Sequence, residues 1–213
     1  MFRPPDPLSM PGSQESLAQS LARAVPLAGT PGEDYVERRG IPLVIANATG
    51  LRFAPDWGGR PAVVVALQDQ HGTLVSVHGR YLCVARDQDK MLTIGPGGGL
   101  VSVQGGWRVD PLIVVEGLFD ALTLGRFGFA CAATIGRWVP WLAEVSVGRT
   151  VWLAFDAGRP GDAQFARYAA HLSGANVKRM LPPGRSKDWN TALLKRSTGT
   201  VESWVRHCLN QTR

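Results

Sequence analysis

Four acidic side chains in the second half of the chain fall where carboxylates can act together. Glu116 directly follows the apolar run LIVV, Asp156 follows the apolar run VWLAF, and Asp120 comes four residues after Glu116. Asp188 stands in a loop before a helical segment. In an open α/β sheet the residues that follow parallel strands meet at one edge, where ligands bind. Carboxylates pooled there repel one another unless a cation is present, and oxygen ligands favour Mg²⁺ or Mn²⁺.

The same acids also have a simpler explanation as helix caps. Asp120 and Asp188 lie near predicted helix starts, where a carboxylate is favourable without any ligand. Glu116 and Asp156 are harder to explain in this way, because a charge directly after a buried strand costs desolvation free energy unless it has a partner. A metal shared by these acids would serve phosphoryl transfer, in which it gathers the phosphate, nucleophile and leaving group.

The segments that would position this site alternate between strand and helix. The apolar runs are typical of strands buried on both faces, and the alternation predicts an α/β domain with a mainly parallel sheet flanked by helices. The predicted strands are 111–117, 130–136, 150–156 and 176–181, and the predicted helices are 119–128, 139–146, 161–174, 188–196 and 201–210.

The first half of the chain has a different pattern. Helical segments at 13–25 and 33–40 precede short β-like runs at 61–69, 72–84, 90–95 and 99–104, which suit an antiparallel meander with one wet face. We therefore expect three parts. They are a mobile tail rich in proline and glycine (1–13), a small α+β subdomain (14–109), and the α/β domain with its C-terminal helices (110–213).

The composition narrows the class of protein. The chain has 213 residues and a net charge of +6, and 45% of its residues are hydrophobic, enough for a sizeable core. From residue 111 onward 13 basic residues outnumber 7 acidic ones, which favours a polyanionic partner such as nucleic acid. No apolar run approaches the roughly 20 residues that span a membrane. Cys83, Cys131 and Cys208 are too widely spaced for a zinc ribbon, and with no secretion signal we expect a cytoplasmic protein.

Three blocks in the second half of the chain resemble the Toprim fold of bacterial-type primases and topoisomerases. They are VEGLFDAL (115–122), VWLAFDAGRPGD (151–162) and KDWN (187–190). Four upstream blocks resemble the segment before Toprim in phage- and plasmid-type primases, so that the resemblance covers roughly residues 29–196. These blocks are GTPGEDYVERRGI (29–41), LRFAPDW (51–57), HGTLVSVHGRYL (71–82) and IGPGGGLVSV (94–103).

The resemblance implies a role for each matching acid. Glu116 would be a general acid or base or a metal-organising carboxylate, and Asp156 the principal Mg²⁺ ligand, with Asp120 in support. Asp188 would lie near a second metal, and Lys187 would contact phosphate. One position departs from the pattern, because Gly158 stands where the family has the second Asp of Asp-x-Asp. This leaves three alternatives: Asp162 or Asp188 takes its place, a metal is held weakly, or the chain is partly or wholly inactive.

Several basic and aromatic residues are candidates for contact with nucleotides or nucleic acid. His78, Arg80 and Tyr81 would contact the template or the incoming nucleotide, although the same residues also suit an ordinary hairpin. Arg159 and Arg185, in loops near strand ends, would follow the nucleic-acid backbone, although single arginines are commonly solvated. Trp57 and Trp107 are the tryptophans that we expect to stack on bases, whereas we expect Trp138, Trp141, Trp152 and Trp189 to be core residues.

The function that these expectations favour is DNA primase-type synthesis. The enzyme would join ribonucleotides on a single-stranded DNA template with Mg²⁺ or Mn²⁺, and release pyrophosphate. Its partners would be the template, nucleoside triphosphates, and a replicative helicase or another replication protein. Two alternatives remain: a Toprim metal-dependent nuclease, and a degenerate, non-catalytic module that binds nucleic acid.

Overall fold

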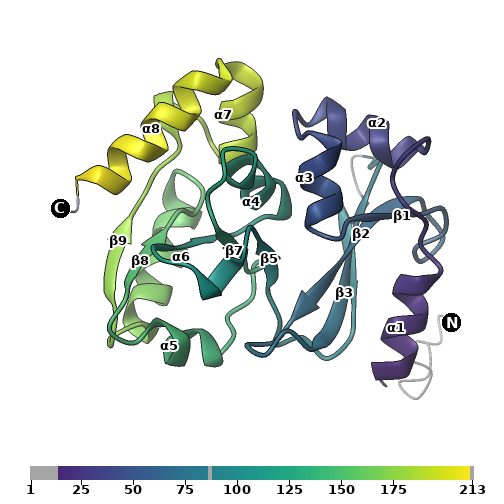
Figure 1. Cartoon of the computed structure of the whole chain (residues 1–213), viewed down its shortest axis with the longest axis horizontal. Helices are drawn as coiled ribbons and strands as arrows, with labels where there is room; N and C mark the ends of the chain where they lie inside the picture. Colours follow the sequence, from purple (N-terminus) through teal and green to yellow (C-terminus); the bar gives the residue numbers. More distant parts are fainter. Residues whose placement is uncertain (1–13, 86–87, 212–213) are drawn as a thin grey trace, which may run out of the picture.

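The polypeptide forms two sheets that lie side by side (Figure 1). This computed structural model describes residues 14–85 and 88–211, so the tail predicted at 1–13 lies outside the described residues. One sheet has the strand order β1-β2-β3-β4 and the other the order β5-β7-β6-β8-β9. None of the helices in the described residues has the length and apolarity that a membrane span requires.

The first sheet is an antiparallel meander, as its alternating sequence predicts. Its strands are β1 (Arg52–Ala54), β2 (Ala62–Gln68), β3 (Leu74–Tyr81) and β4 (Met91–Ile94). Three helices pack around it: α1 (Gln14–Ala22), α2 (Pro31–Arg38) and α3 (Leu43–Ala48). The side chain of Thr30 accepts a hydrogen bond from the backbone of Gly32 and caps α2, which begins two residues before the predicted segment 33–40.

The prediction of one wet face on this meander is wrong. Val63 and Val65 belong to the core cluster that continues into the second sheet, whereas Ala62 and Val64 pack with Leu17 of α1. Because α1 covers one face and the main core covers the other, β2 is buried on both sides. Strand alternation alone does not reveal a helix that docks from elsewhere in the chain.

The second sheet is the predicted α/β unit. Its strands are β5 (Val101–Val103), β6 (Leu112–Val115), β7 (Cys131–Ala133), β8 (Thr150–Leu153) and β9 (Asn176–Arg179). The last four are parallel, and β5 pairs antiparallel with β7 at one edge. Residues 99–104 were expected in the meander, and this expectation is wrong for β5. β5 instead belongs to the second sheet. An isolated β-bridge between Gln68, the last residue of β2, and Leu100, the residue before β5, connects the two sheets.

Helices cover both faces of this sheet, as predicted. Side chains of α4 (Leu118–Gly125), α7 (Trp189–Lys195) and α8 (Thr198–Asn210) share one core cluster with α2 and α3. On the other face lie α5 (Trp141–Ser146) and α6 (Arg159–His171). Alternate residues of β6 supply the two faces, with Ile113 and Val115 on the first and Leu112 and Val114 on the second. The first cluster therefore joins both sheets into one continuous core.

Candidate active site

A cavity of about 240 Å³ lies between the two units, at the carboxyl ends of the parallel strands. Five of the predicted site residues line it: Glu116, Asp120, Asp188, His78 and Arg80. The remaining lining comes from both units and is Arg39, Met91, Gly117, Leu118, Phe119, Ile135, Gly136 and Asn190. The sheet edge and the meander thus bring together acids and bases that are far apart in sequence.

The β6–α4 turn places two of the acids. Glu116 follows the last residue of β6 and is half-buried, because the buried strand delivers it to the sheet edge. Asp120 lies in the first turn of α4, where its Oδ1 accepts a hydrogen bond from the backbone N–H of Asn190 at 3.1 Å. Gly117 allows this packing, since a Cβ on it would come within 2.6 Å of Asp120 Oδ2.

Asp188 is the third acid of the cavity lining and completes its acidic wall, whereas Asp156 lies outside the lining but near enough for its charge to act on Glu116 and Asp120. Asp156 is half-buried two residues beyond Ala154, and Lys187 Nζ lies 3.9 Å from its Oδ2. The backbone N–H of Ala157 donates to Lys187 O at 2.7 Å and holds the two loops together. Asp188 caps α7, with its Oδ1 accepting from Thr191 N at 2.6 Å. The cap explanation is therefore correct for Asp188, which faces the cavity as well.

These carboxylates share one electrostatic environment. Burial raises the pKa of Asp120 to about 7, and the charges of Asp188 and Asp156 add to the rise. Burial also raises the pKa of Glu116 and of Asp156, helped by the Asp156 charge in the first case and by Asp188 in the second. The Lys187 ammonium opposes both shifts. The charge of Asp156 thus acts on Glu116 and Asp120, and that of Asp188 acts on Asp120 and Asp156.

The acidic wall fits a hard divalent cation in its chemistry. Every candidate ligand is a carboxylate oxygen, the donor type that Mg²⁺ prefers, and a cation would relieve the repulsion that raises these pKa values. Within residues 14–85 and 88–211, however, no three such side chains already converge as a metal cage. Asp188 is engaged in its cap and Asp156 lies beside Lys187, so holding a metal requires these side chains to turn.

Of the two residues considered as substitutes for the missing carboxylate at Gly158, only Asp188 reaches this wall. Asp162 instead pairs with Arg179, Oδ1 to Nη2 at 3.3 Å, and its side chain is largely exposed. The same Arg179 nitrogen donates to the backbone oxygen of Asp156 at 2.7 Å, and Arg179 does not line the cavity. The close approach of α6 depends on Gly161, where a Cβ would lie 1.8 Å from Asp156 O.

Restoring a carboxylate at position 158 should cost stability. Gly158 has φ 93° and ψ 177°, a backbone conformation that is essentially reserved for glycine. We expect Gly158→Asp and Gly158→Ala to lower the free energy of unfolding by a similar amount, about 1–3 kcal/mol. Chemical denaturation measures this. Since no atom lies within 4 Å of the added Cβ, the loss reflects the backbone alone, and two variants as stable as the parent would contradict it.

The pKa of Asp120 predicts a pH dependence for the metal-free protein. Between pH 4 and pH 7 the folded chain keeps this carboxyl protonated, whereas the unfolded chain ionises it near the ordinary value of 3.8. The free energy of unfolding should therefore fall as the pH rises through this window, by up to about 1.4 kcal/mol per pH unit. Asp120→Asn keeps an acceptor for Asn190 and should flatten this part of the slope in denaturation curves recorded with a chelator. An unchanged slope in the variant would contradict the shift.

The opposite wall of the cavity is cationic. Arg80 Nε is buried, and the described residues offer it no hydrogen-bond partner. His78 is buried, and Nδ1 of its ring lies 2.9 Å from Thr93 Oγ1. Burial lowers the pKa of His78 to about 4, with the charges of Arg80 and Arg137 adding to the effect, so the ring is neutral at physiological pH. Two arginines, Arg39 and Arg80, on one side of the cavity favour an anionic ligand.

Two lining residues, Arg39 and Asn190, were missed as functional candidates. Both lie in blocks that carry the family resemblance, yet nothing in their spacing distinguishes them. Arg39 Nη1 donates to Asn190 Oδ1 at 2.9 Å across 151 positions of sequence. In the sequence each residue is simply a polar residue near one end of a predicted helix. Such a pair is therefore found only from a structure, or from contacts inferred from related sequences.

Other predicted contact residues lie outside the cavity. Tyr81 is buried in the core beneath the Arg60 guanidinium, whose carbon is 3.5 Å from the ring centre. Trp57 and Trp107 are also buried, so the prediction that they stack on bases is wrong. Three predicted cations are exposed on the surface beyond the lining: Arg159, Arg185 and Lys187.

Comparisons with known proteins agree with this geometry. Residues 113–193 match the family model described as Toprim-like, and residues 11–101 match a domain of unknown function (DUF7146). Among curated protein sequences, none is significantly similar to the chain.

Solved structures share the fold over nearly the whole chain. The DnaG primase catalytic domain bound to single-stranded DNA has a TM-score of 0.69 and 19% identity, covering 91% of this chain and 78% of that one. A DNA primase domain from Pseudomonas aeruginosa has a TM-score of 0.69 and 18% identity, over 93% and 78% of the two chains. The zinc-binding and RNA polymerase domains of the Aquifex aeolicus primase give a TM-score of 0.68 and 16% identity. That match covers 95% of this chain but only 63% of the Aquifex chain. At these identities the likeness establishes the fold.

Proposed function

Because residues 113–193 match the Toprim-like family model and the chain has the fold of the bacterial primase catalytic cores, we propose that it is a DNA primase-type nucleotidyltransferase. It would join ribonucleotides on a single-stranded DNA template. The observation that carries the proposal is the cavity with carboxylates on one wall and arginines on the other. A nucleoside triphosphate presents negative phosphates to the cations and shares a divalent cation with the acids.

The residues of the two walls would have different roles in catalysis. Arg39 and Arg80 would bind phosphate oxygens, for which a planar guanidinium is well suited. Asp156 and Asp188 would hold Mg²⁺ or Mn²⁺, which when bound neutralises charge on the triphosphate. Glu116, whose pKa is raised by burial, would hold the proton of the attacking 3′-hydroxyl. No covalent intermediate with the protein is needed, since positioning and charge neutralisation carry this chemistry.

We also propose that the chain consists of two units, 14–109 and 110–213, which both contribute to the site. The unit 14–109 would supply Arg39, His78 and Arg80, and the unit 110–213 would supply the acids, so the substrate binds at their boundary. The exposed Arg159, Arg185 and Lys187 would contact the template backbone. We place this activity in the cytoplasm, with a replicative helicase or another replication protein as partner.

A second candidate function is a non-catalytic module that binds single-stranded nucleic acid. Two observations favour it: glycine occupies position 158, in a backbone conformation that disfavours a carboxylate-bearing residue, and no metal cage is preformed among the described acids. Such a module would keep the cationic surface and lose the chemistry.

Incorporation of labelled ribonucleotides on single-stranded DNA, with Mg²⁺ or Mn²⁺, tests the proposal. We expect short labelled products that require both template and metal. End-labelled DNA incubated without nucleotides serves as the matched reaction for a nuclease, and its shortening would favour that activity. Binding to DNA with neither incorporation nor cleavage would favour the non-catalytic module.

A further inference from the structure

Asn190 joins three separate segments around the cavity. The residue is 2% exposed, and its side-chain amide makes three hydrogen bonds. Nδ2 donates to Arg39 O at 2.8 Å and to Thr123 Oγ1 at 3.2 Å, and Oδ1 accepts from Arg39 Nη1 at 2.9 Å. Its backbone N–H donates to Asp120 Oδ1 at 3.1 Å. One residue therefore contacts the cationic wall and the acidic wall together.

The Arg39 guanidinium is held on a second side by aromatic rings. Its carbon lies 4.6 Å from the centre of the Phe119 ring and 5.8 Å from that of Tyr35. The two rings pack edge-to-face at 5.5 Å and form a floor for the cation. A guanidinium fixed by a ring below and an amide beside it loses little conformational entropy when it binds a ligand.

We propose that Asn190 is a positioning residue that fixes the Arg39 guanidinium and the Asp120 carboxylate relative to one another across the cavity. The inference rests on the proposed function, because it takes the ligand to be a nucleoside triphosphate whose phosphates reach Arg39. Without the Asn190 amide, Arg39 keeps its aromatic floor but loses the contacts that set its direction. Phosphate binding should then weaken even though the fold remains.

A neighbouring contact supplies a matched control. Arg126 Nη1 donates to the backbone oxygen of Gly40, so this side chain ties the end of α4 to the residue next to Arg39. Arg126 does not line the cavity. Arg126→Ala therefore removes a contact between the same two units without touching the direction of the Arg39 guanidinium. Thr123→Val is a finer control, because it removes one partner of the Asn190 amide and leaves the pair with Arg39 in place.

The experiment measures ATP affinity by calorimetry in the absence of metal, together with thermal unfolding, for the full chain. We expect Asn190→Ala to weaken ATP binding by about tenfold, the loss typical when a residue that orients a ligand-binding group is removed. Arg126→Ala and Thr123→Val should stay within about twofold of the parent at comparable losses in Tm. Should Asn190→Ala fail to fold, Asn190→Asp replaces it. That isosteric carboxylate competes with phosphate for Arg39, and we expect it to weaken binding as well.

The outcomes separate the inference from the proposed function. ATP affinity at the parental level in the Asn190 variants, or an equal loss in Arg126→Ala, would overturn the positioning role. A parent protein that binds ATP with the expected variant pattern but incorporates no nucleotide would support the positioning role and contradict the primase proposal. A parent that fails to bind ATP would overturn both.

Discussion

Asp156→Ala should lower nucleotide incorporation by at least about 10²-fold and leave binding to single-stranded DNA nearly unchanged. The carboxylate comes three residues after β8 and is half-buried, and it shares one electrostatic environment with Glu116 and Asp188, with which it would hold a cation. Removing one side chain that stabilises charge in an active site typically lowers the rate by about 10²–10³-fold. We expect binding to survive, because the substitution leaves in place the exposed cations that we propose to contact the template, Arg159, Arg185 and Lys187.

Glu116→Ala should have a similar effect, and Asp162→Ala is the matched control for both. Asp162 is a carboxylate only six residues beyond Asp156, but it pairs with Arg179, whereas the charge of Asp156 acts on Glu116 and Asp120. Its removal should keep activity within about threefold, in line with the small worth of an exposed ion pair. Incorporation and DNA binding are measured in parallel on all three variants. Parental activity in Asp156→Ala would show that the chemistry lies elsewhere.

The acidic wall was within reach of sequence reasoning because its position depends on simple local signals. The runs before Glu116 and Asp156 are continuous and apolar, which predicts strands buried on both faces, and both strands are present and parallel. Once two such strands lie side by side, the sheet geometry places their following residues at one edge. The mainly parallel, helix-flanked sheet is confirmed for the same reason.

The cationic wall depends on contacts that no local pattern carries. Arg39 becomes a cavity residue only because α2 packs beside α4 and α7, and its partner Asn190 lies far along the chain. The failed expectations have the same origin. Val101 and Val103 alternate like any strand of the meander, and pairing with β7 decides where they belong. Trp57 was expected to stack on bases, but its indole N–H donates to Leu92 O and its ring fills the core between α1 and the sheet.

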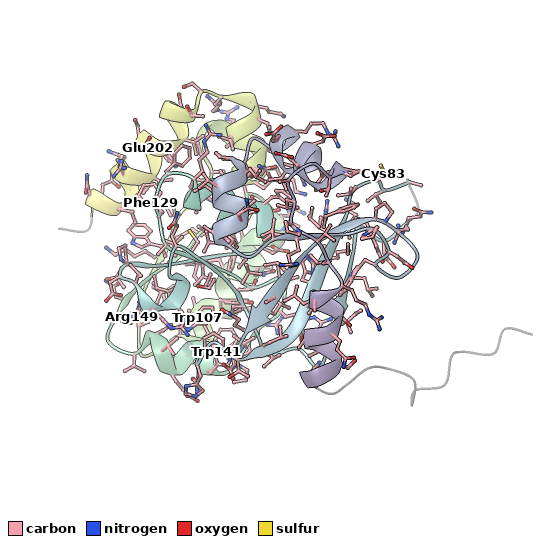
Figure 2. All side chains as sticks on the ribbon, turned by 45° about the vertical axis from the view of Figure 1, so that its right-hand side comes forward. Cys83, Trp107, Phe129, Trp141, Arg149 and Glu202 are labelled. Carbon is pink, nitrogen blue, oxygen red and sulfur yellow. The ribbon has the colours of Figure 1, made fainter. Side chains whose placement is uncertain are left out.

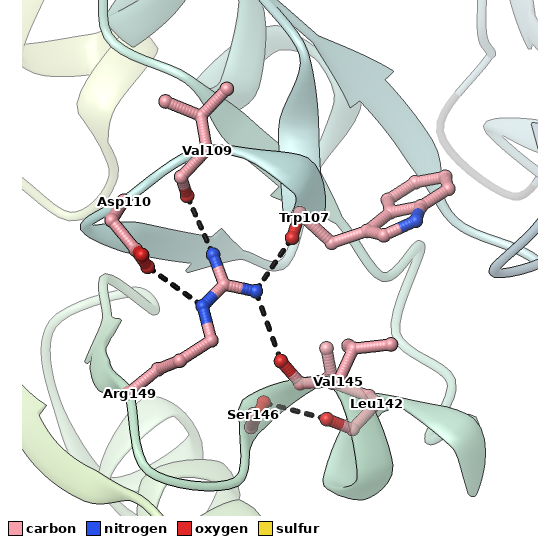
Figure 3. A network of polar contacts seen from close by, with 7 residues as sticks. All are labelled: Trp107, Val109, Asp110, Leu142, Val145, Ser146 and Arg149. Atoms are coloured by element: carbon pink, nitrogen blue, oxygen red, sulfur yellow. Dashed lines mark hydrogen bonds and ion pairs between the residues drawn. The ribbon is translucent and has the colours of Figure 1, made fainter.

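Arg149→Ala should lower the free energy of unfolding by about 3 kcal/mol, since one guanidinium holds four acceptors (Figure 3). Nε donates to Asp110 Oδ1 at 2.7 Å, and Nη2 donates to Val109 O at 2.7 Å. Nη1 is shared between Trp107 O at 2.7 Å and Val145 O at 2.9 Å. The side chain thus ties the segment that enters β6 to α5. Its loss leaves these carbonyls without their charged donor.

Thermal unfolding checks this prediction, and Arg206→Ala provides the control. A change of about 3 kcal/mol should lower Tm by roughly 6 to 12 °C in a chain of this size. Arg206 pairs with Glu202 on α8 and lies over the Phe129 ring, so its removal should cost under about 0.5 kcal/mol. Figure 2 shows Glu202 and Phe129 well away from Arg149 and Trp107. Arg149 precedes β8 and therefore lies at the sheet edge opposite the acids. Below the lowered Tm, Arg149→Ala should keep parental incorporation per folded molecule, whereas a loss of activity without a loss of stability would contradict a purely structural role.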